Sequence, residues 1–141
     1  MKNFDFILRL AEVIPSFSQL HAYCDKAEIF QKTFPEESAT NARKALEWLV
    51  RNHLHMANVT LEPRETLNEM LKHPEIDAFI DEDWEFERDM RTVKKIGNYA
   101  SHTGAQEVKK NDAFICLRAL YYVVSGFLFR WRAIQNIVAF D

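Results

Sequence analysis

With 141 residues, of which 48% are hydrophobic and 28% charged, the chain has the size and composition of one domain with a packed core. Its three glycines and four prolines are too few for a many-stranded sheet, which needs a turn about every 8–12 residues, so the composition predicts an all-α fold. The net charge of −3 and the pI of about 6.0 exclude the basic excess typical of stand-alone nucleic-acid-binding domains, so a nucleic-acid contact would need a local basic patch.

The first half of the chain reads as helices joined by short connections. Apolar residues at helical spacing predict helices over residues 4–14 and 16–30, separated at Pro15. Thr33 and Glu36 have the spacing of a capping box, which would open a long helix that extends to Leu54. A connection over 56–63 is followed by a short helix over 66–71 and a turn over 76–80. In the first helix we expect an apolar face of Phe4, Ile7, Leu8, Ala11 and Ile14.

The second half contains two long helices. Asp81 is predicted to cap the first, whose early turns are acidic and whose later turns are basic, in the order that complements the helix dipole. Residues 103–110 are predicted to form a loop, and Asn111 to cap a last helix that ends near Trp131. The apolar stretch over 119–129 is interrupted by Ser125 and Gly126, so we expect a buried core helix there, with no membrane span. The apolar face of this last helix is expected to be Ile115, Leu120, Val123, Val124, Phe127 and Leu128.

The sequence therefore predicts a single helical domain over residues 1–141, an all-α compact bundle of about five to six helices. Cys24 and Cys116 form no CxxC motif, and the N-terminus lacks the features of a signal peptide. We expect both cysteines to be reduced and buried in a cytoplasmic protein. The apolar ending over 137–141 predicts that this is the N-terminal part of a longer protein, because natural C-termini are usually polar.

One face of the helix predicted after Asp81 gathers the candidate site residues within about 80°. They are Arg88, Arg91, Lys95, Asn98 and His102. Cations, an amide and an imidazole are the groups that hold a phosphate and move a proton, so the five are candidates for nucleic-acid binding, and His102 with Lys95 for catalysis. A solvated face that balances the acidic first turns is the alternative interpretation. Gly97 lies inside this helix, where glycine lowers helix stability by about 1 kcal/mol relative to Ala. A glycine at such a position indicates that another helix or a partner backbone approaches closely.

Residues 97–102 read Gly-Asn-Tyr-Ala-Ser-His, a Gly-Asn-x-Ala-x-His pattern near the end of the penultimate long helix. Shorter fragments accompany it along the chain: Asn3, Phe4, Phe6, Ala27, Glu28, Pro35, Arg43, Leu46, Glu47, Phe140 and Asp141. In this combination the chain resembles, over nearly its whole length, the helical domain at the N-terminus of type I restriction enzyme R subunits, which is similar in turn to the HEPN superfamily. The resemblance implies a HEPN-like fold without a cofactor, in a cytoplasmic DNA-restriction and defence system. It also implies a parent protein that carries ATP-dependent DNA translocation and cleavage elsewhere.

HEPN ribonucleases combine an arginine with a histidine four to six residues later and cleave RNA without a metal, often across a dimer interface. His102 matches the histidine, but the arginine positions hold Gly97, Ile96 and Lys95, and lysine lacks the planar fork that grips a phosphate. The resemblance therefore implies a non-catalytic interaction domain. Its partners would be other domains or subunits of a restriction complex, or DNA or RNA bound by the basic face. A HEPN-type ribonuclease, a homodimer, and a stand-alone defence or toxin–antitoxin protein remain alternatives.

Other patterns predict no site. His53 and His55 are two apart and point to different faces of a helix, so we expect solvated or capping histidines and no metal. Glu107 and Lys109 have the form of a restriction-nuclease motif, but they lie outside any strand and have no upstream Asp. No glycine-rich phosphate loop is present. The aromatic residues are expected to be core or interface residues: Trp48, Trp84, Tyr121, Tyr122 and Trp131.

Overall fold

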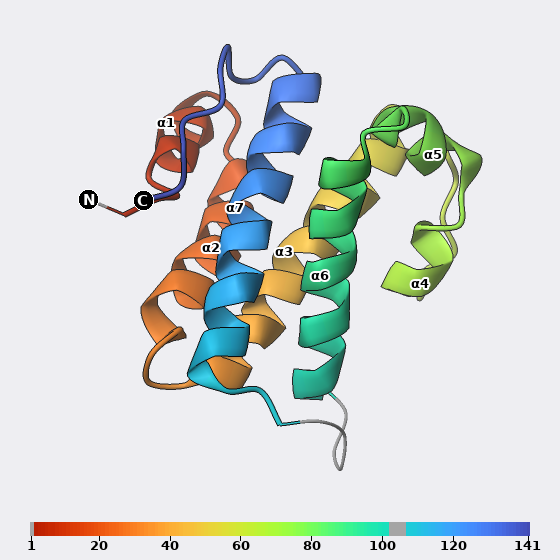
Figure 1. Ribbon diagram of the computed structural model, residues 1–141. Helices are drawn as coiled ribbons and strands as arrows, with labels where there is room; N and C mark the ends of the chain where they lie inside the picture. The colour runs from red at the N-terminus through yellow and green to blue at the C-terminus, as the bar shows by residue number, and fades with distance from the viewer. Residues whose placement is uncertain (1, 102–106) are drawn as a thin grey trace.

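The computed structural model of the chain describes residues 2–101 and 107–141, and in this part it contains seven α-helices and no strand (Figure 1). The helices are α1 (Phe6–Val13), α2 (Phe17–Phe30), α3 (Pro35–Met56), α4 (Leu67–Met70), α5 (Pro74–Ile80), α6 (Trp84–Ser101) and α7 (Lys110–Arg130). The predicted all-α bundle is confirmed. It has more helices than the predicted five to six, because the segment expected as a turn over 76–80 forms the short helix α5.

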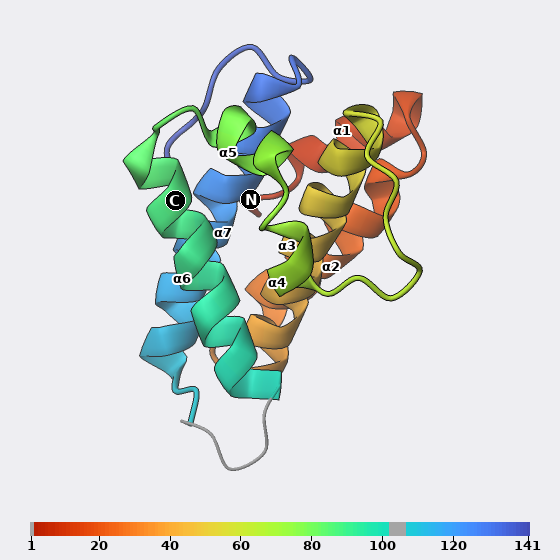
Figure 2. The ribbon, with the colours of Figure 1, turned by 90° about the vertical axis from the view of Figure 1, so that its right-hand side faces the viewer.

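The four long helices α2, α3, α6 and α7 form the bundle (Figures 1 and 2). α3 packs against α2, α6 and α7, and α6 packs against α7. α1 lies against α2, whereas α4 and α5 pack on α3 and α5 also contacts α6, so the small helices cover opposite sides of the bundle. The apolar faces of α2 and α3 are buried: Phe17, Leu20, Cys24 and Ala27 in α2, and Ala39, Ala42, Leu46, Leu49 and Val50 in α3.

α7 is the central apolar helix. By length and composition alone it is apolar enough to cross a membrane, but 67% of its most apolar window is buried inside the bundle, as in the core helix of a soluble domain. The predicted buried helix over 119–129 is thus confirmed except at its last residue, Phe129, which is exposed. Of the apolar face predicted for the whole helix, Ile115 is exposed. Both cysteines are buried free thiols, and burial raises the pKa of Cys116 to about 12.

Three predicted helix caps are wrong. α3 begins at Pro35, so Phe34 occupies the cap position, and Thr33 lies one residue outside it and makes no capping hydrogen bond. Proline favours this start because its fixed φ suits the first position of a helix. Asp81 instead ends α5 in the left-handed conformation, and the Asp83 carboxylate accepts a hydrogen bond from the Phe86 N–H at the start of α6. Asn111 lies inside the first turn of α7, which begins at Lys110.

The apolar face predicted for the first helix is only half correct. Phe4 and Ile7 are buried, but Leu8 and Ile14 are exposed. α1 is short and lies at the edge of the bundle, so it is covered from one side only.

Candidate functional site

The cationic residues of the predicted face of α6 are exposed, but two of the three are engaged with neighbouring carboxylates. The Arg88 guanidinium contacts Asp89 at 3.2 Å and lies 5.2 Å from the centre of the Trp84 ring. Arg91 pairs with Glu87 at 2.8 Å, four residues earlier. Lys95 is exposed and forms no ion pair with any residue that the structure describes. A phosphate would have to compete for Arg88 and Arg91, whereas Lys95 is available to it.

Asn98 does not belong to the solvent-facing group. Its side-chain oxygen accepts a hydrogen bond of 2.8 Å from Nε of Arg43 on α3, and Nη1 of Arg43 contacts Glu47 at 2.8 Å. We call Arg43, Glu47, Gly97 and Asn98 the α3–α6 network. The amide that the sequence placed beside the cations is therefore a contact between two helices.

Gly97 makes this contact possible. A Cβ atom at position 97 would lie 2.6 Å from the Cβ atom of Arg43 and 3.2 Å from the carbonyl oxygen of Ala39. Of the two expectations for Gly97, close approach of another helix is confirmed, and that helix is α3. His102, the fifth residue of the predicted face, lies outside the described residues.

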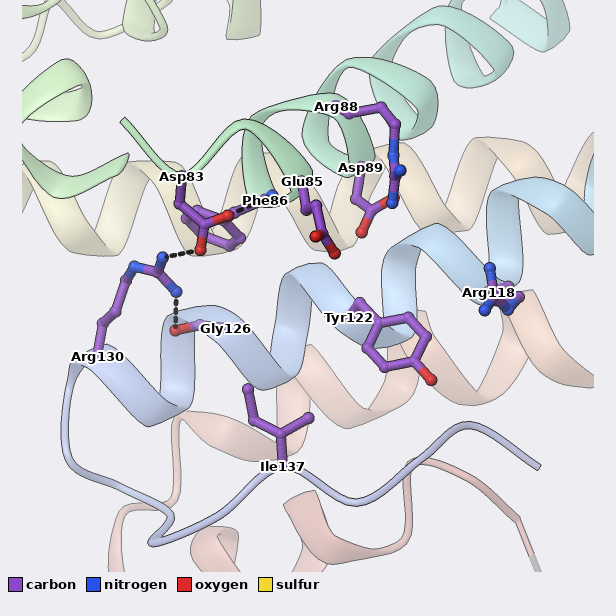
Figure 3. Close-up of a pocket in the computed structure, with 10 residues that line it drawn as sticks. All are labelled: Asp83, Glu85, Phe86, Arg88, Asp89, Arg118, Tyr122, Gly126, Arg130 and Ile137. Carbon is purple, nitrogen blue, oxygen red and sulfur yellow. Dashed lines mark hydrogen bonds and ion pairs between the residues drawn. The ribbon is translucent and has the colours of Figure 1, made fainter. Parts of the chain in front are cut away.

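A pocket of about 400 Å³ lies between α6, α7 and the C-terminal segment, residues 131–141 (Figure 3). At one end Arg130 pairs with Asp83 at 2.8 Å and lies 4.0 Å from the centre of the Phe86 ring. The backbone N–H of Phe86, and then Arg130, lower the pKa of Asp83, whereas burial raises the pKa of Asp89. The charged residues lining the pocket are three acids, Asp83, Glu85 and Asp89, and three arginines, Arg88, Arg118 and Arg130. The lining thus has no excess of either charge, and Arg88 is the one lining residue that the sequence predicted as a candidate site residue.

The two ends of the chain are held together by a second set of polar contacts, which we call the terminal network. The Asn3 side chain accepts a hydrogen bond of 2.9 Å from the backbone N–H of Asp141 and donates one of 2.7 Å to the Glu28 carboxylate on α2. The backbone N–H of Asn3 also donates to Glu28, at 3.2 Å. The termini consequently lie side by side next to α1 (Figure 1).

The C-terminal segment has no helix, and two tyrosines of α7 fix its backbone. The Tyr121 hydroxyl donates to the carbonyl of Val138 at 2.8 Å, and the Tyr122 hydroxyl accepts from the N–H of Phe140 at 3.1 Å. The Phe140 ring packs on the Tyr121 ring at a centroid separation of 5.5 Å. Both tyrosines therefore have structural roles, in line with the sequence interpretation.

His53 is also a structural residue. Its ring packs on Phe79 at a centroid separation of 3.9 Å, and its Nδ1 accepts a hydrogen bond of 3.1 Å from Nε1 of Trp131. Nδ1 must be unprotonated to accept this bond, and burial lowers the pKa of His53, which favours the neutral ring. In the part of the chain that the structure describes, no three His, Cys, Asp or Glu side chains lie close enough to hold a metal ion.

Comparison of the chain with protein-family models, with curated proteins and with solved structures gave no match.

Proposed function

We propose that the chain is a non-catalytic, HEPN-like interaction domain of the kind found at the N-terminus of type I restriction enzyme R subunits. In a cytoplasmic restriction complex it would bind the rest of the motor subunit or a partner subunit, with the exposed cations of α6 available to DNA or RNA. One observation carries the proposal. Several residues on which the resemblance depends are far apart in the sequence, but they contact one another in the α3–α6 network and in the terminal network.

In the α3–α6 network each residue type has a specific physical role. Position 97 must be glycine for α6 to approach α3 so closely. At this separation the Arg43 side chain reaches Asn98, which supplies an acceptor, and Glu47, one turn along α3, holds the other side of the guanidinium. A pattern that combines residues 55 positions apart thus corresponds to one physical contact. Chance combinations of short motifs would not be expected to meet in this way.

The terminal network explains why fragments at both ends of the chain belong to the same pattern. Asn3 and Asp141 are 138 positions apart and are joined directly, with Glu28 as a shared partner of Asn3. A domain whose two ends are fixed at one place is suited to attachment to a larger protein at a single point.

The environment of the HEPN arginine positions favours a docking role over ribonuclease chemistry. Of the three positions where a HEPN ribonuclease could have its arginine, 96 and 97 hold Ile96 and Gly97, which are buried in the bundle. The third holds Lys95, which is exposed and is the one cation among the three residues. The neighbouring amide of Asn98 is engaged by Arg43. The described residues therefore offer no arginine at these positions to stabilise the charge that develops on a phosphate during cleavage.

The reading frame beyond the codon for Asp141 tests the proposal. A frame that continues into a motor with a P-loop is the expected result, and a stop codon shortly after Asp141 would reject it. In the full-length protein, His102→Ala should leave restriction of unmodified DNA in cells unchanged. Loss of restriction in this variant, with the protein still folded and assembled, would point to catalysis by the domain. If the frame stops, RNA cleavage by wild type and by His102→Ala tests the ribonuclease alternative.

A further inference from the structure

Two charged side chains in the lining of the pocket between α6 and α7 form no ion pair within the described part of the chain (Figure 3). Four of the six charged residues in this lining belong to the two ion pairs described above. The other two, Glu85 and Arg118, are exposed, and their side chains make no hydrogen bond to the described residues. The Arg118 guanidinium lies 5.4 Å from the centre of the Tyr122 ring. One acid and one base are therefore available to a partner on the same side of the molecule.

Glu85 and Arg118 lie apart along the pocket. The ring of Phe86, which follows Glu85, packs so closely on Gly126 of α7 that a Cβ atom there would lie 2.6 Å from it. Glu85 is therefore level with the part of α7 around Gly126. Arg118 is eight residues before Gly126, which corresponds to about 12 Å along the helix axis. Tyr122 is the midpoint between residues 118 and 126, so the unpaired acid and the unpaired base lie on its two sides (Figure 3).

Apolar side chains on the outer face of α7 are arranged around the same midpoint. Ile115 is seven residues before Tyr122 and Phe129 is seven residues after it, and seven residues are close to two helical turns, so the three share a face. Ile115 and Phe129 are each 46% exposed. Ile137 of the C-terminal segment, which lines the pocket near Tyr122, is 43% exposed. We call these residues the α7 face: Glu85, Ile115, Arg118, Tyr122, Phe129 and Ile137.

The α7 face is complementary to itself. A two-fold axis that crosses α7 at Tyr122 would place the α7 helices of two copies antiparallel, with each position opposite the one equally far from Tyr122 on the other copy. Ile115 of one copy would then lie opposite Phe129 of the other, and Arg118 opposite Glu85. A two-fold contact needs such a patch, because its members pair with members of the same patch. A partner with charges of only one sign would be repelled by either Glu85 or Arg118.

We infer that the α7 face binds a second copy of this chain around a two-fold axis at Tyr122, with Arg118 of each copy paired to Glu85 of the other. The inference goes beyond the proposed function and does not depend on it, because every residue of the contact belongs to the described chain. The contact also differs from the dimer of the ribonuclease alternative, which would bring two histidines together. Position 102 follows the other end of α6, whose 18 residues span about 27 Å.

Sedimentation velocity of residues 1–141 over a range of concentrations tests the inference. The α7 face has fewer residues than the roughly 20–30 a side of a standard interface, so we expect weak association with a Kd of about 10–100 µM. The average mass should rise from 16.6 kDa towards twice that value between about 1 µM and 1 mM. A mass of 16.6 kDa over the whole range would overturn the inference.

Charge reversal tests the pairing itself. Glu85→Arg and Arg118→Glu should each weaken association by at least about tenfold, because each places like charges opposite each other twice in one dimer. The double variant should associate like wild type, and an equal mixture of the two single variants should form the mixed dimer, since opposite charges meet again in both.

A matched control separates this pairing from a change in net charge. Lys44→Glu reverses an exposed charge on α3, outside the α7 face, and should leave the Kd within about twofold of wild type. If it weakens association as much as Arg118→Glu does, the inference is overturned. Failure of the double variant to recover, with circular dichroism showing all variants folded, would also overturn it.

Discussion

Gly97→Ala is the sharpest test of the contact between α3 and α6. The added methyl would lie 2.6 Å from the Cβ atom of Arg43, where non-bonded carbons prefer about 3.5–4.0 Å, and 3.2 Å from the carbonyl oxygen of Ala39. The Arg43 Cβ atom is fixed to the backbone of α3, so it cannot rotate away as the end of a flexible side chain would. The two helices would have to separate by roughly 1 Å at this point.

Three effects determine the size of the change. Alanine is favoured over glycine in a helix by about 1 kcal/mol. Overpacking of a helix contact costs about 1–3 kcal/mol. Separation also weakens the hydrogen bond of 2.8 Å between Arg43 and Asn98, which contributes about 1 kcal/mol. The net expectation is a loss of about 1–3 kcal/mol in the free energy of unfolding, and thus a Tm lower by roughly 3–10 °C.

Thermal unfolding followed by circular dichroism measures this change. Thr92→Ala is a suitable control, because it also gains helix propensity on α6 but lies away from α3, and it should change Tm by no more than about 2 °C. In an Arg43→Gly background the obstructing Cβ atom is absent, so Gly97→Ala should cost at least about 1 kcal/mol less than in wild type. A Gly97→Ala protein as stable as wild type would show that the helices do not approach as described.

Three further predictions concern single side chains. Arg132 has a φ of 61° just after α7, so Arg132→Gly should raise the free energy of unfolding by about 0.5–1 kcal/mol in urea titrations, and a lower value would contradict this explanation. Burial lowers the pKa of His53 below its usual 6.5, so its contribution to stability is complete above pH 6.5 and is lost as the pH falls towards the lower folded-state pKa. His53→Gln should therefore reduce the slope of stability against pH between about pH 5 and 7 relative to wild type, and identical slopes would refute this role. Lys95→Glu should weaken binding of a single-stranded oligonucleotide and reduce its salt dependence by about 0.7 in log–log slope, measured by fluorescence anisotropy. Lys44→Glu, at an exposed cation of α3, should have little effect, and equal losses in both variants would indicate a general charge effect.

Helix positions and core faces were largely predictable, because apolar residues recur with the helical period in α2, α3, α6 and α7. Helix starts were less predictable. Thr33 and Asp81 are both common capping residues, but Pro35 sets the start of α3, and Asp81 adopts a φ of 51° that ends α5 instead. Thr66 and Glu69 form a complete capping box, a pattern that is present in the sequence but was not among the predicted caps. Several short polar residues near each helix start compete for the same role, and local spacing does not choose between them.

The candidate site was predictable only where contacts are local. Periodicity correctly predicted that Arg88, Arg91 and Lys95 face solvent, and the pairing of Glu87 with Arg91 follows from a spacing of four residues. The contact between Arg43 and Asn98 joins two residues 55 positions apart on different helices, so helical periodicity alone could not show that the Asn98 side chain is engaged by α3. The presence of Gly97 was the one local indication that another helix passes close by.

The cationic face of α6 is limited in how it can contribute to binding. On α6, Arg88 and Arg91 are already paired with carboxylates, and exposed ion pairs contribute little and are screened by salt. A phosphate that binds Arg88 or Arg91 must replace a carboxylate, so the gain from the new contact is offset by the loss of the old one. Such a face can orient a charged partner but supplies little affinity of its own.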